Sequence, residues 1–139
     1  MNWIVWSLLS AAFAAATALL AKVGVTGVDP NLATAIRTTV VVLMAWGIAL
    51  GFRAHTGLSG IDSRSWMFLA ASGVATGLSW LCYFRALSMA PASKVAPIDK
   101  LSVVFVILLA APLLGEALST KKIVGGSLIA IGAVVLAFA

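Results

Sequence analysis

Long apolar runs alternate with short polar segments along the whole chain. The runs cover residues 3–21, 32–52, 66–87, 92–114 and 123–139. Each is close to the roughly 20 residues that a helix needs to cross the hydrocarbon core of a bilayer. The pattern predicts an all-α integral membrane protein with five transmembrane helices, which form a single domain over residues 1–139.

The first run has a rival interpretation as a cleaved signal peptide, because Ala12-Phe13-Ala14 resembles a small-residue cleavage site. A signal peptide also needs a positively charged region before its apolar part, and Met1-Asn2 supplies only the terminal amine. We therefore interpret residues 3–21 as a transmembrane helix.

The composition agrees with lipid as the main solvent. The chain is 63% hydrophobic and 9% charged, with a mean hydropathy of +1.15, whereas soluble domains are about 45–50% apolar and about 25% charged. The net charge of +5 comes from cations scattered singly between the apolar runs. This spacing is typical of loops anchored at lipid headgroups, so the bilayer is an expected partner and nucleic acid is not.

The residue inventory holds no reactive constellation. Cys82 and His55 are each the single residue of their type, and the four acidic residues are well separated. Neither a zinc site of the usual nitrogen and sulfur ligands nor a nucleophile–base–acid set can be assembled from these residues. We predict no enzyme activity, no catalytic residue, no metal and no cofactor.

The fourth run is unusual because charged groups lie inside it. Asp99 and Lys100 follow Pro97 in a segment that is otherwise apolar, and each charge costs about 2.5–3.5 kcal/mol at the centre of a membrane helix on insertion scales. Pro97 is either a first-turn proline of a helix that starts late or a kink in a helix that starts at Ala92. In the second case the two charges lie roughly 10–12 Å along the helix. We predict that they form the polar centre of a functional site.

Arg37 lies inside the second run, roughly 8–9 Å along the expected helix. Its long side chain could snorkel to the headgroups, or it could be a pathway cation paired across helices. The pattern leaves both interpretations open.

A stripe of larger side chains marks the third run at steps of three and four residues, comprising Thr76, Trp80, Tyr83 and Leu87. Such a stripe is either helix packing or part of a substrate site. The hydrogen-bonding tips of Thr, Trp and Tyr need partners in hydrocarbon, so we expect the stripe to face the interior.

The last run has no charge after Lys122 and contains Gly125, Gly126 and Gly132. Small residues let helix backbones approach each other in lipid. They serve packing within one chain or a dimer seam, and we predict the seam because this helix carries no pathway residues.

The distribution of Lys and Arg gives the chain little preference for one orientation. One side of the membrane would hold Lys22, Arg37, Arg85, Lys94 and Lys100, and the other Arg53, Arg64, Lys121 and Lys122. Orientation follows this bias. A chain with a weak bias can insert both ways, and two copies would then reproduce the inverted repeats of many transporters. We predict a homodimer, antiparallel by preference.

Several segments resemble the EamA-type transporters of the drug/metabolite transporter superfamily, in their short, single-repeat, five-helix form. The most specific are Gly77–Leu87 leading into Ala92–Pro97, and the Leu114-Gly115-Glu116 end of the fourth run. Ala33–Arg37 and the glycines of the last run add to the likeness.

The resemblance implies secondary transport of small metabolites or drugs by alternating access, in a multi-pass protein of the cytoplasmic (inner) membrane of a prokaryote. The seven-residue spacing from Gly125 to Gly132 looks like the dimerising last helix of the small multidrug resistance proteins. This chain lacks the membrane-embedded Glu that those proteins carry in their first helix. Proton-coupled export of cationic drugs is therefore not expected.

We predict a substrate pathway that several cations make positive, which favours a small-molecule substrate with a carboxylate or phosphate. The expected pathway residues are Arg37, Thr76, Trp80, Tyr83, Arg85, Ser93, Lys94, Pro97, Asp99, Lys100 and Ser102, and the expected dimer interface is Gly125, Gly126 and Gly132. The alternative is a structural or regulatory membrane subunit that moves nothing itself.

Overall fold

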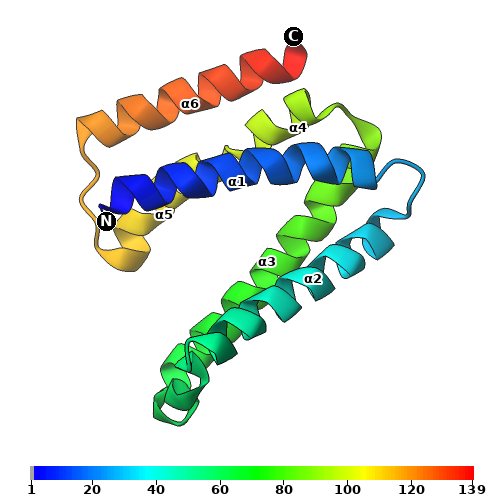
Figure 1. Cartoon of the computed structure of the whole chain (residues 1–139). Coiled ribbons are helices and arrows are strands. Elements are labelled where there is room, and N and C mark those ends of the chain that lie inside the picture. Colours follow the sequence, from blue (N-terminus) through cyan, green and yellow to red (C-terminus); the bar gives the residue numbers. More distant parts are fainter. Residues whose placement is uncertain (1) are drawn as a thin grey trace. The chain divides into compact units, whose positions relative to one another are not determined.

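The computed structural model describes residues 2–139 as helices joined by short connections. The elements are α1 (Trp3–Gly24), α2 (Pro30–Gly51), the 3-10 helix η1 (Ala54–Gly60), α3 (Ser63–Met89), α4 (Ala92–Asp99), α5 (Ser102–Leu114) and α6 (Thr120–Phe138) (Figure 1). Five segments are long and apolar enough to cross a membrane, namely α1, α2, α3, α4 together with α5, and α6. The prediction of an all-α membrane protein with five spans is confirmed.

The chain divides into two compact units. Unit 1 comprises Met1–Lys22 and Met89–Ala139, and unit 2 comprises Val23–Ser88. Each unit contains one group of the candidate functional side chains.

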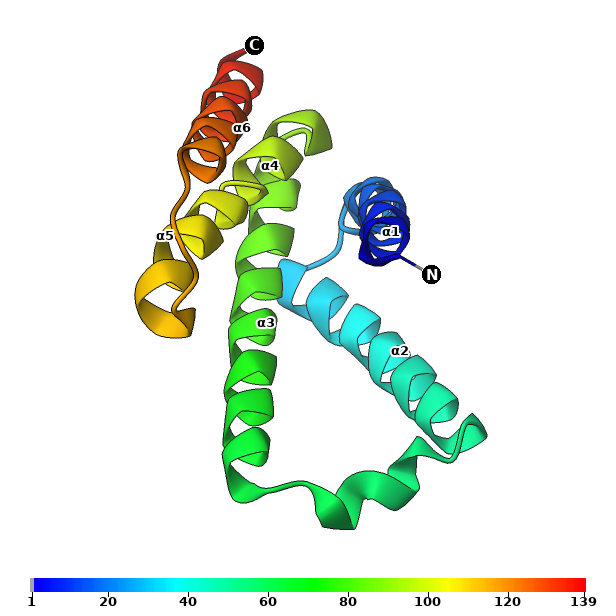
Figure 2. The ribbon, with the colours of Figure 1, turned by 90° about the vertical axis from the view of Figure 1, so that its left-hand side faces the viewer.

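Unit 2 is a hairpin of α2 and α3. Asp29 starts α2 because its carboxylate accepts hydrogen bonds from the backbone N–H groups of Asn31 at 2.8 Å and Leu32 at 3.1 Å. Figure 2 shows α2 and α3 diverging from the Pro30 end of α2 towards η1, which connects their far ends. The polar segment between the second and third apolar runs of the sequence therefore contains a short helix of its own.

The buried residues of the hairpin lie at its narrow end. They include Ala33 and Thr34 of α2 and Phe84 and Leu87 of α3. The hydroxyl group of Thr34 donates to the carbonyl oxygen of Pro30 at 2.8 Å, so its proton is satisfied inside the helix. The buried residues of the hairpin are thus concentrated at one of its ends.

In unit 1, α6 packs against α4 and α5, and Figure 2 shows the three helices next to one another. The Lys22 ammonium at the end of α1 donates to the carbonyl oxygen of Ala90 at 2.9 Å, just before α4 begins. This bond ties the first helix to the turn from which the fourth span starts.

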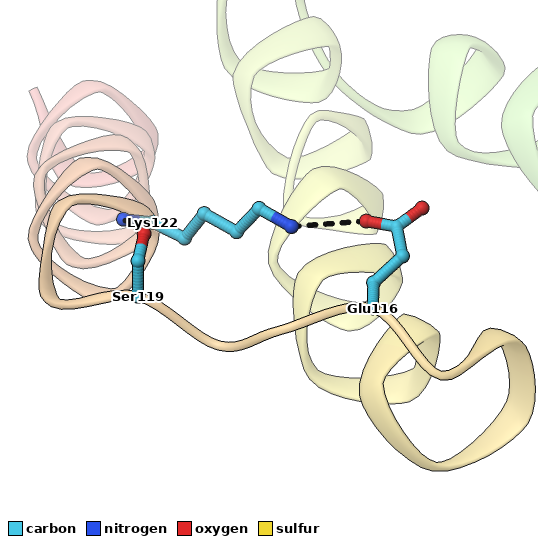
Figure 3. Close-up of polar contacts among 3 residues, drawn as sticks. All are labelled: Glu116, Ser119 and Lys122. Atoms are coloured by element: carbon cyan, nitrogen blue, oxygen red, sulfur yellow. Dashed lines mark hydrogen bonds and ion pairs between the residues drawn. The ribbon is translucent and has the colours of Figure 1, made fainter.

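The connection from α5 to α6 is closed by polar contacts. Gly115 ends α5 in the left-handed region with φ of 70°, a conformation that glycine adopts without steric cost. Lys122 reaches across the loop to Glu116 at 3.0 Å, and the Ser119 hydroxyl oxygen accepts the backbone N–H of Lys122 at 3.3 Å (Figure 3). The ion pair is exposed and contributes at most about 1 kcal/mol, so its main effect is to fix the start of α6.

The fourth span is divided, whereas the sequence pattern predicts one helix over residues 92–114. The helix starts at Ala92 and Pro97 lies within it, so the interpretation of Pro97 as a first-turn proline is wrong. The division comes at Lys100 and Leu101, three to four residues beyond the proline. The backbone N–H groups of Leu101, Val103 and Val104 each donate to the carbonyl three residues earlier, at 2.9–3.0 Å. These tighter turns satisfy the backbone while the chain leaves the α-helical path.

Candidate functional site

The α4–α5 break carries the charged pair that the sequence singles out. The Lys100 ammonium lies 3.2 Å from a carboxylate oxygen of Asp99, and the two side chains are 56% and 36% exposed. Lys100 stands at the C-terminal end of α4, where the helix dipole favours a positive charge. The break therefore holds two opposite charges that neutralise each other and remain accessible.

The other predicted pathway residues of this span surround the break. Ser93 is exposed and Lys94 half-buried in the first turn of α4, while Ser102 is exposed at the first position of α5. Pro97 has no N–H to donate to the carbonyl oxygen of Ser93. Polar side chains and a weakened backbone thus occur together in the first half of an apolar span.

Arg37 forms the second group, in unit 2. Its guanidinium carbon lies 4.1 Å from the ring centroid of Trp80 and 5.6 Å from that of Phe84. Arg37 is seven residues from the start of α2 and Trp80 nine residues from the end of α3. At 1.5 Å per residue these distances are about 10 Å and about 13 Å. The cation thus lies well inside the hairpin and against α3, an arrangement that favours the interpretation as an interior cation over snorkelling.

The aromatic rings offset only part of the cost of this charge. A cation–π contact is worth about 0.5–1 kcal/mol when exposed and about 2 kcal/mol when desolvated, whereas an Arg at the centre of a membrane helix costs about 2.5–3.5 kcal/mol on insertion scales. Among residues 2–139, neither of the ion pairs, Asp99–Lys100 and Glu116–Lys122, includes Arg37. The aromatic contacts leave part of this cost uncompensated, and Tyr83 is a further polar neighbour of the guanidinium.

The predicted stripe on α3 divides between the interior and the surface. Leu87 is buried and Trp80 and Tyr83 are half-buried, in keeping with a stripe that faces the interior. Thr76 differs, because it is exposed and its hydroxyl group donates to the carbonyl oxygen of Ser72 at 2.9 Å. Since a bond within the helix satisfies the hydroxyl, Thr76 does not need an interior partner. Arg85 is also exposed.

A groove between α2 and α3 was not foreseen from the sequence. It is an open groove of about 420 Å³, lined by Asn31, Thr34, Ala35, Thr38, Thr39, Val42, Leu43, Gly77 and Leu81. The hydroxyl groups of Thr38 and Thr39 donate to the carbonyl oxygens of Thr34 and Ala35, which leaves their oxygens as acceptors. The sequence signal that could have indicated this groove is the series of polar residues on α2, Asn31, Thr34, Thr38 and Thr39, which follow one another at steps of three, four and one residues. Phe84 was also missed, although it follows Trp80 by one helical turn.

The glycines of α6 lie on different faces. A Cβ atom at Gly126 would meet the Cδ1 atom of Ile107 at 3.4 Å, whereas nothing lies within 4 Å of one at Gly125 or Gly132. Gly126 is buried together with Ala133, seven residues later on the same face. Gly126 thus serves packing within the chain, while Gly125 and Gly132 remain open to another helix.

Metal chemistry finds no support in the described residues. Across residues 2–139, no three side chains of His, Cys, Asp or Glu come together as ligands. Cys82 is exposed and unpaired with another cysteine. The charged groups inside the membrane spans are the Asp99–Lys100 pair at the α4–α5 break and Arg37 on α2, and both are partly accessible.

Five spans with charged groups within them define a multi-pass membrane protein. The chain belongs to the EamA-like transporter family, whose family model matches residues 1–138. A curated relative from Sinorhizobium sp., described as an uncharacterized transporter in the cobO 3′ region, is 48% identical over 136 residues. The aligned part covers 98% of this chain and 96% of the relative. No solved structure matches the chain significantly.

Proposed function

We propose that this EamA-family transporter is a small secondary transporter that moves metabolites or drugs across the cytoplasmic membrane of a prokaryote by alternating access. The observation that carries the proposal is the charged α4–α5 break in the first half of the fourth span. Helices broken at mid-membrane are a recurrent feature of transporter binding sites, because the freed backbone and charged groups can contact substrate there. The pathway runs past Asp99 and Lys100.

Transport by this chain requires a second copy. Few side chains are buried among the described residues, and most large apolar residues are exposed. One copy therefore covers little of its own surface. The open glycines Gly125 and Gly132 support α6 as the seam of a homodimer.

The weak bias of Lys and Arg supports an antiparallel arrangement of the two copies. The test is labelling of single cysteines placed in each loop, from each side of intact cells, in a chain whose Cys82 is replaced by serine. Antiparallel dimers require every loop to be labelled from both sides. Labelling of each loop from one side alone would exclude dual topology.

The Lys100→Ala variant tests the site. It should abolish substrate flux into proteoliposomes while still inserting, because the substitution removes a charge and leaves the apolar residues of the span unchanged. Lys121→Ala is the matched control, since Lys121 lies in the first turn of α6, outside the proposed site. Flux in Lys100→Ala equal to that of the unaltered protein would remove Lys100 from the pathway.

The purified protein also decides between transport and a structural role. A transporter moves its substrate alone in liposomes. A structural or regulatory subunit yields no flux by itself, and its charged pair would serve to hold a partner. Candidate substrates come from a thermal-shift screen of metabolites, because a ligand that binds only the folded state raises the melting temperature.

A further inference from the structure

We infer that Arg37 is the receptor for the anionic group of the substrate, a carboxylate or phosphate, and that Trp80 holds the guanidinium in place to bind it. This inference deepens the proposed transport function and rests on it. It assigns the anion to Arg37 in unit 2 and leaves the Asp99–Lys100 pair as a separate polar element of the pathway.

The geometry of the cation leaves its hydrogen-bonding edge usable. Arg37 lies over the Trp80 ring at 4.1 Å from the centroid, with the Phe84 ring at 5.6 Å. A guanidinium stacked on a ring uses its flat face, while its N–H groups point outward in its own plane. That planar fork matches the oxygens of a carboxylate or phosphate and binds them through two parallel hydrogen bonds. The rings thus orient the fork without occupying it.

The anion must come from outside the chain, because every acidic side chain is already engaged. The chain has four acidic residues. Asp29 accepts backbone N–H groups at the start of α2, and Asp62 does the same before α3 through Ser65. Asp99 and Glu116 pair with Lys100 and Lys122. A second copy of the chain brings the same four carboxylates, each of which already has a partner of its own.

The position of Arg37 favours a soluble substrate over a lipid phosphate. The side chain turns to α3 and meets the turn between Trp80 and Phe84, which lies about 8–13 Å from the end of that helix. A snorkelling arginine extends instead towards the headgroups at the helix end.

The neighbouring groove indicates the kind of molecule that carries the anion. Thr34 and Thr38, which flank Arg37 along α2, belong to its lining. Its volume of about 420 Å³ lies within the range of small-molecule pockets. The rest of the lining is largely aliphatic, with Val42, Leu43 and Leu81. The ligand class is therefore a small organic acid with a mainly apolar body.

The first experiment measures binding to the full chain in phosphatidylcholine vesicles. The probes are hexanoate, its neutral isostere hexanamide and inorganic phosphate. Hexanoate or phosphate should bind, and hexanamide should not. In Arg37→Gln the dissociation constant should rise roughly tenfold or more, as expected when a charge-assisted hydrogen-bonded pair is lost. Arg37→Lys keeps the positive charge but lacks the planar guanidinium. Its dissociation constant should lie between that of the unaltered protein and that of Arg37→Gln.

Arg64→Gln is the matched control. Arg64 also lies over an aromatic ring, with its guanidinium carbon 5.8 Å from the Phe68 centroid, but it is exposed at the start of α3. The control should bind the anions as the unaltered protein does. Equal affinity of Arg37→Gln and the unaltered protein overturns the inference.

A second measurement on the unaltered protein covers the case in which Arg37→Gln does not fold. Phenylglyoxal modifies accessible arginines, and the modified sites are read by mass spectrometry. Hexanoate or phosphate should protect Arg37 but not Arg64, and hexanamide should protect neither. Protection by phosphatidylglycerol vesicles alone, or by no anion, overturns the inference. Flux measured in parallel separates the two proposals, because anion binding without flux removes the transport function, while flux without anion binding removes only the role of Arg37.

Discussion

Acidic side chains in this protein act close to their own place in the chain. Asp29 and Asp62 each accept backbone N–H groups at the start of a helix, the position where a carboxylate satisfies donors that have no partner within the helix. Asp99 and Glu116 pair with lysines one and six residues away. Local structure thus uses the few acids available, and the interior cation Arg37 is left to aromatic rings.

Asp62 should titrate below the ordinary range of an aspartate. Hydrogen bonds from the Ser65 side chain, and next from its backbone N–H, lower the pKa of the Asp62 carboxyl below 3.8. A lowered folded-state pKa means that this group stabilises the folded protein above the unfolded pKa. That contribution disappears as the pH falls through the folded pKa. An NMR titration of the Asp62 carboxyl in detergent micelles should give a midpoint below 3.8.

Replacing Ser65 by alanine supplies the control for this titration. The variant keeps the backbone N–H bond at 3.3 Å and loses the hydroxyl group. Its midpoint should lie higher than that of the unaltered protein. A midpoint that does not respond to the substitution would mean that the Ser65 hydroxyl does not hold the carboxylate.

At the scale of elements, Pro97 weakens the helix in which it lies. Replacing it by alanine restores an N–H donor to the carbonyl oxygen of Ser93 and removes a penalty of about 3 kcal/mol for proline inside a helix. Amide exchange at Ile98–Leu101 should slow in hydrogen–deuterium exchange, and substrate flux should slow with it if the break must flex.

Pro112→Ala is the matched variant, because Pro112 lies inside α5 in the same span. It should leave exchange at Ile98–Leu101 unchanged. Equal exchange rates in Pro97→Ala and the unaltered protein would assign the break to a cause other than the proline.

The elements were predictable where hydropathy alone decides them. Each predicted span begins and ends within three residues of the corresponding helical segment in the structure. The agreement is close because about 20 apolar residues in lipid have to form a helix. The break at Lys100 and Leu101 was not predictable as a position. The position of a proline predicts which backbone hydrogen bond is missing, but it does not predict at which residue the helix is interrupted. The 3-10 helix η1 has no apolar period that would reveal it.

The site was predictable only where its residues are neighbours in sequence. Asp99 and Lys100, predicted as the polar centre of the site, pair with each other because they are adjacent. The contact of Arg37 with Trp80 joins α2 to α3, and periodicity along each helix does not say which faces meet. For the same reason Phe84 and the threonines of the groove were missed, and Gly126 was grouped with glycines that lie on another face.

For the molecule as a whole, substitutions at the glycines of α6 distinguish packing within the chain from dimer assembly. Gly132→Leu should weaken dimerisation in detergent while leaving the folded chain intact, because nothing lies within 4 Å of a Cβ atom there. Gly126→Leu should instead lower the stability of the chain, because the new side chain meets Ile107. Chemical cross-linking reports the first effect and thermal unfolding the second. A Gly132→Leu dimer as stable as that of the unaltered protein would exclude this seam.

The neighbouring positions of Asp99 and Lys100 also matter while the protein is being made. Asp99 and Lys100 together add no net charge to the fourth span, because they are adjacent residues of opposite charge and lie 3.2 Å apart in the folded chain. Its parts, α4 with 8 residues and α5 with 13, are each too short to cross alone and so have to enter the bilayer together. Because Asp99 lies next to Lys100, the segment can insert both charges into the membrane as a neutral pair, and no other helix has to supply a counterion.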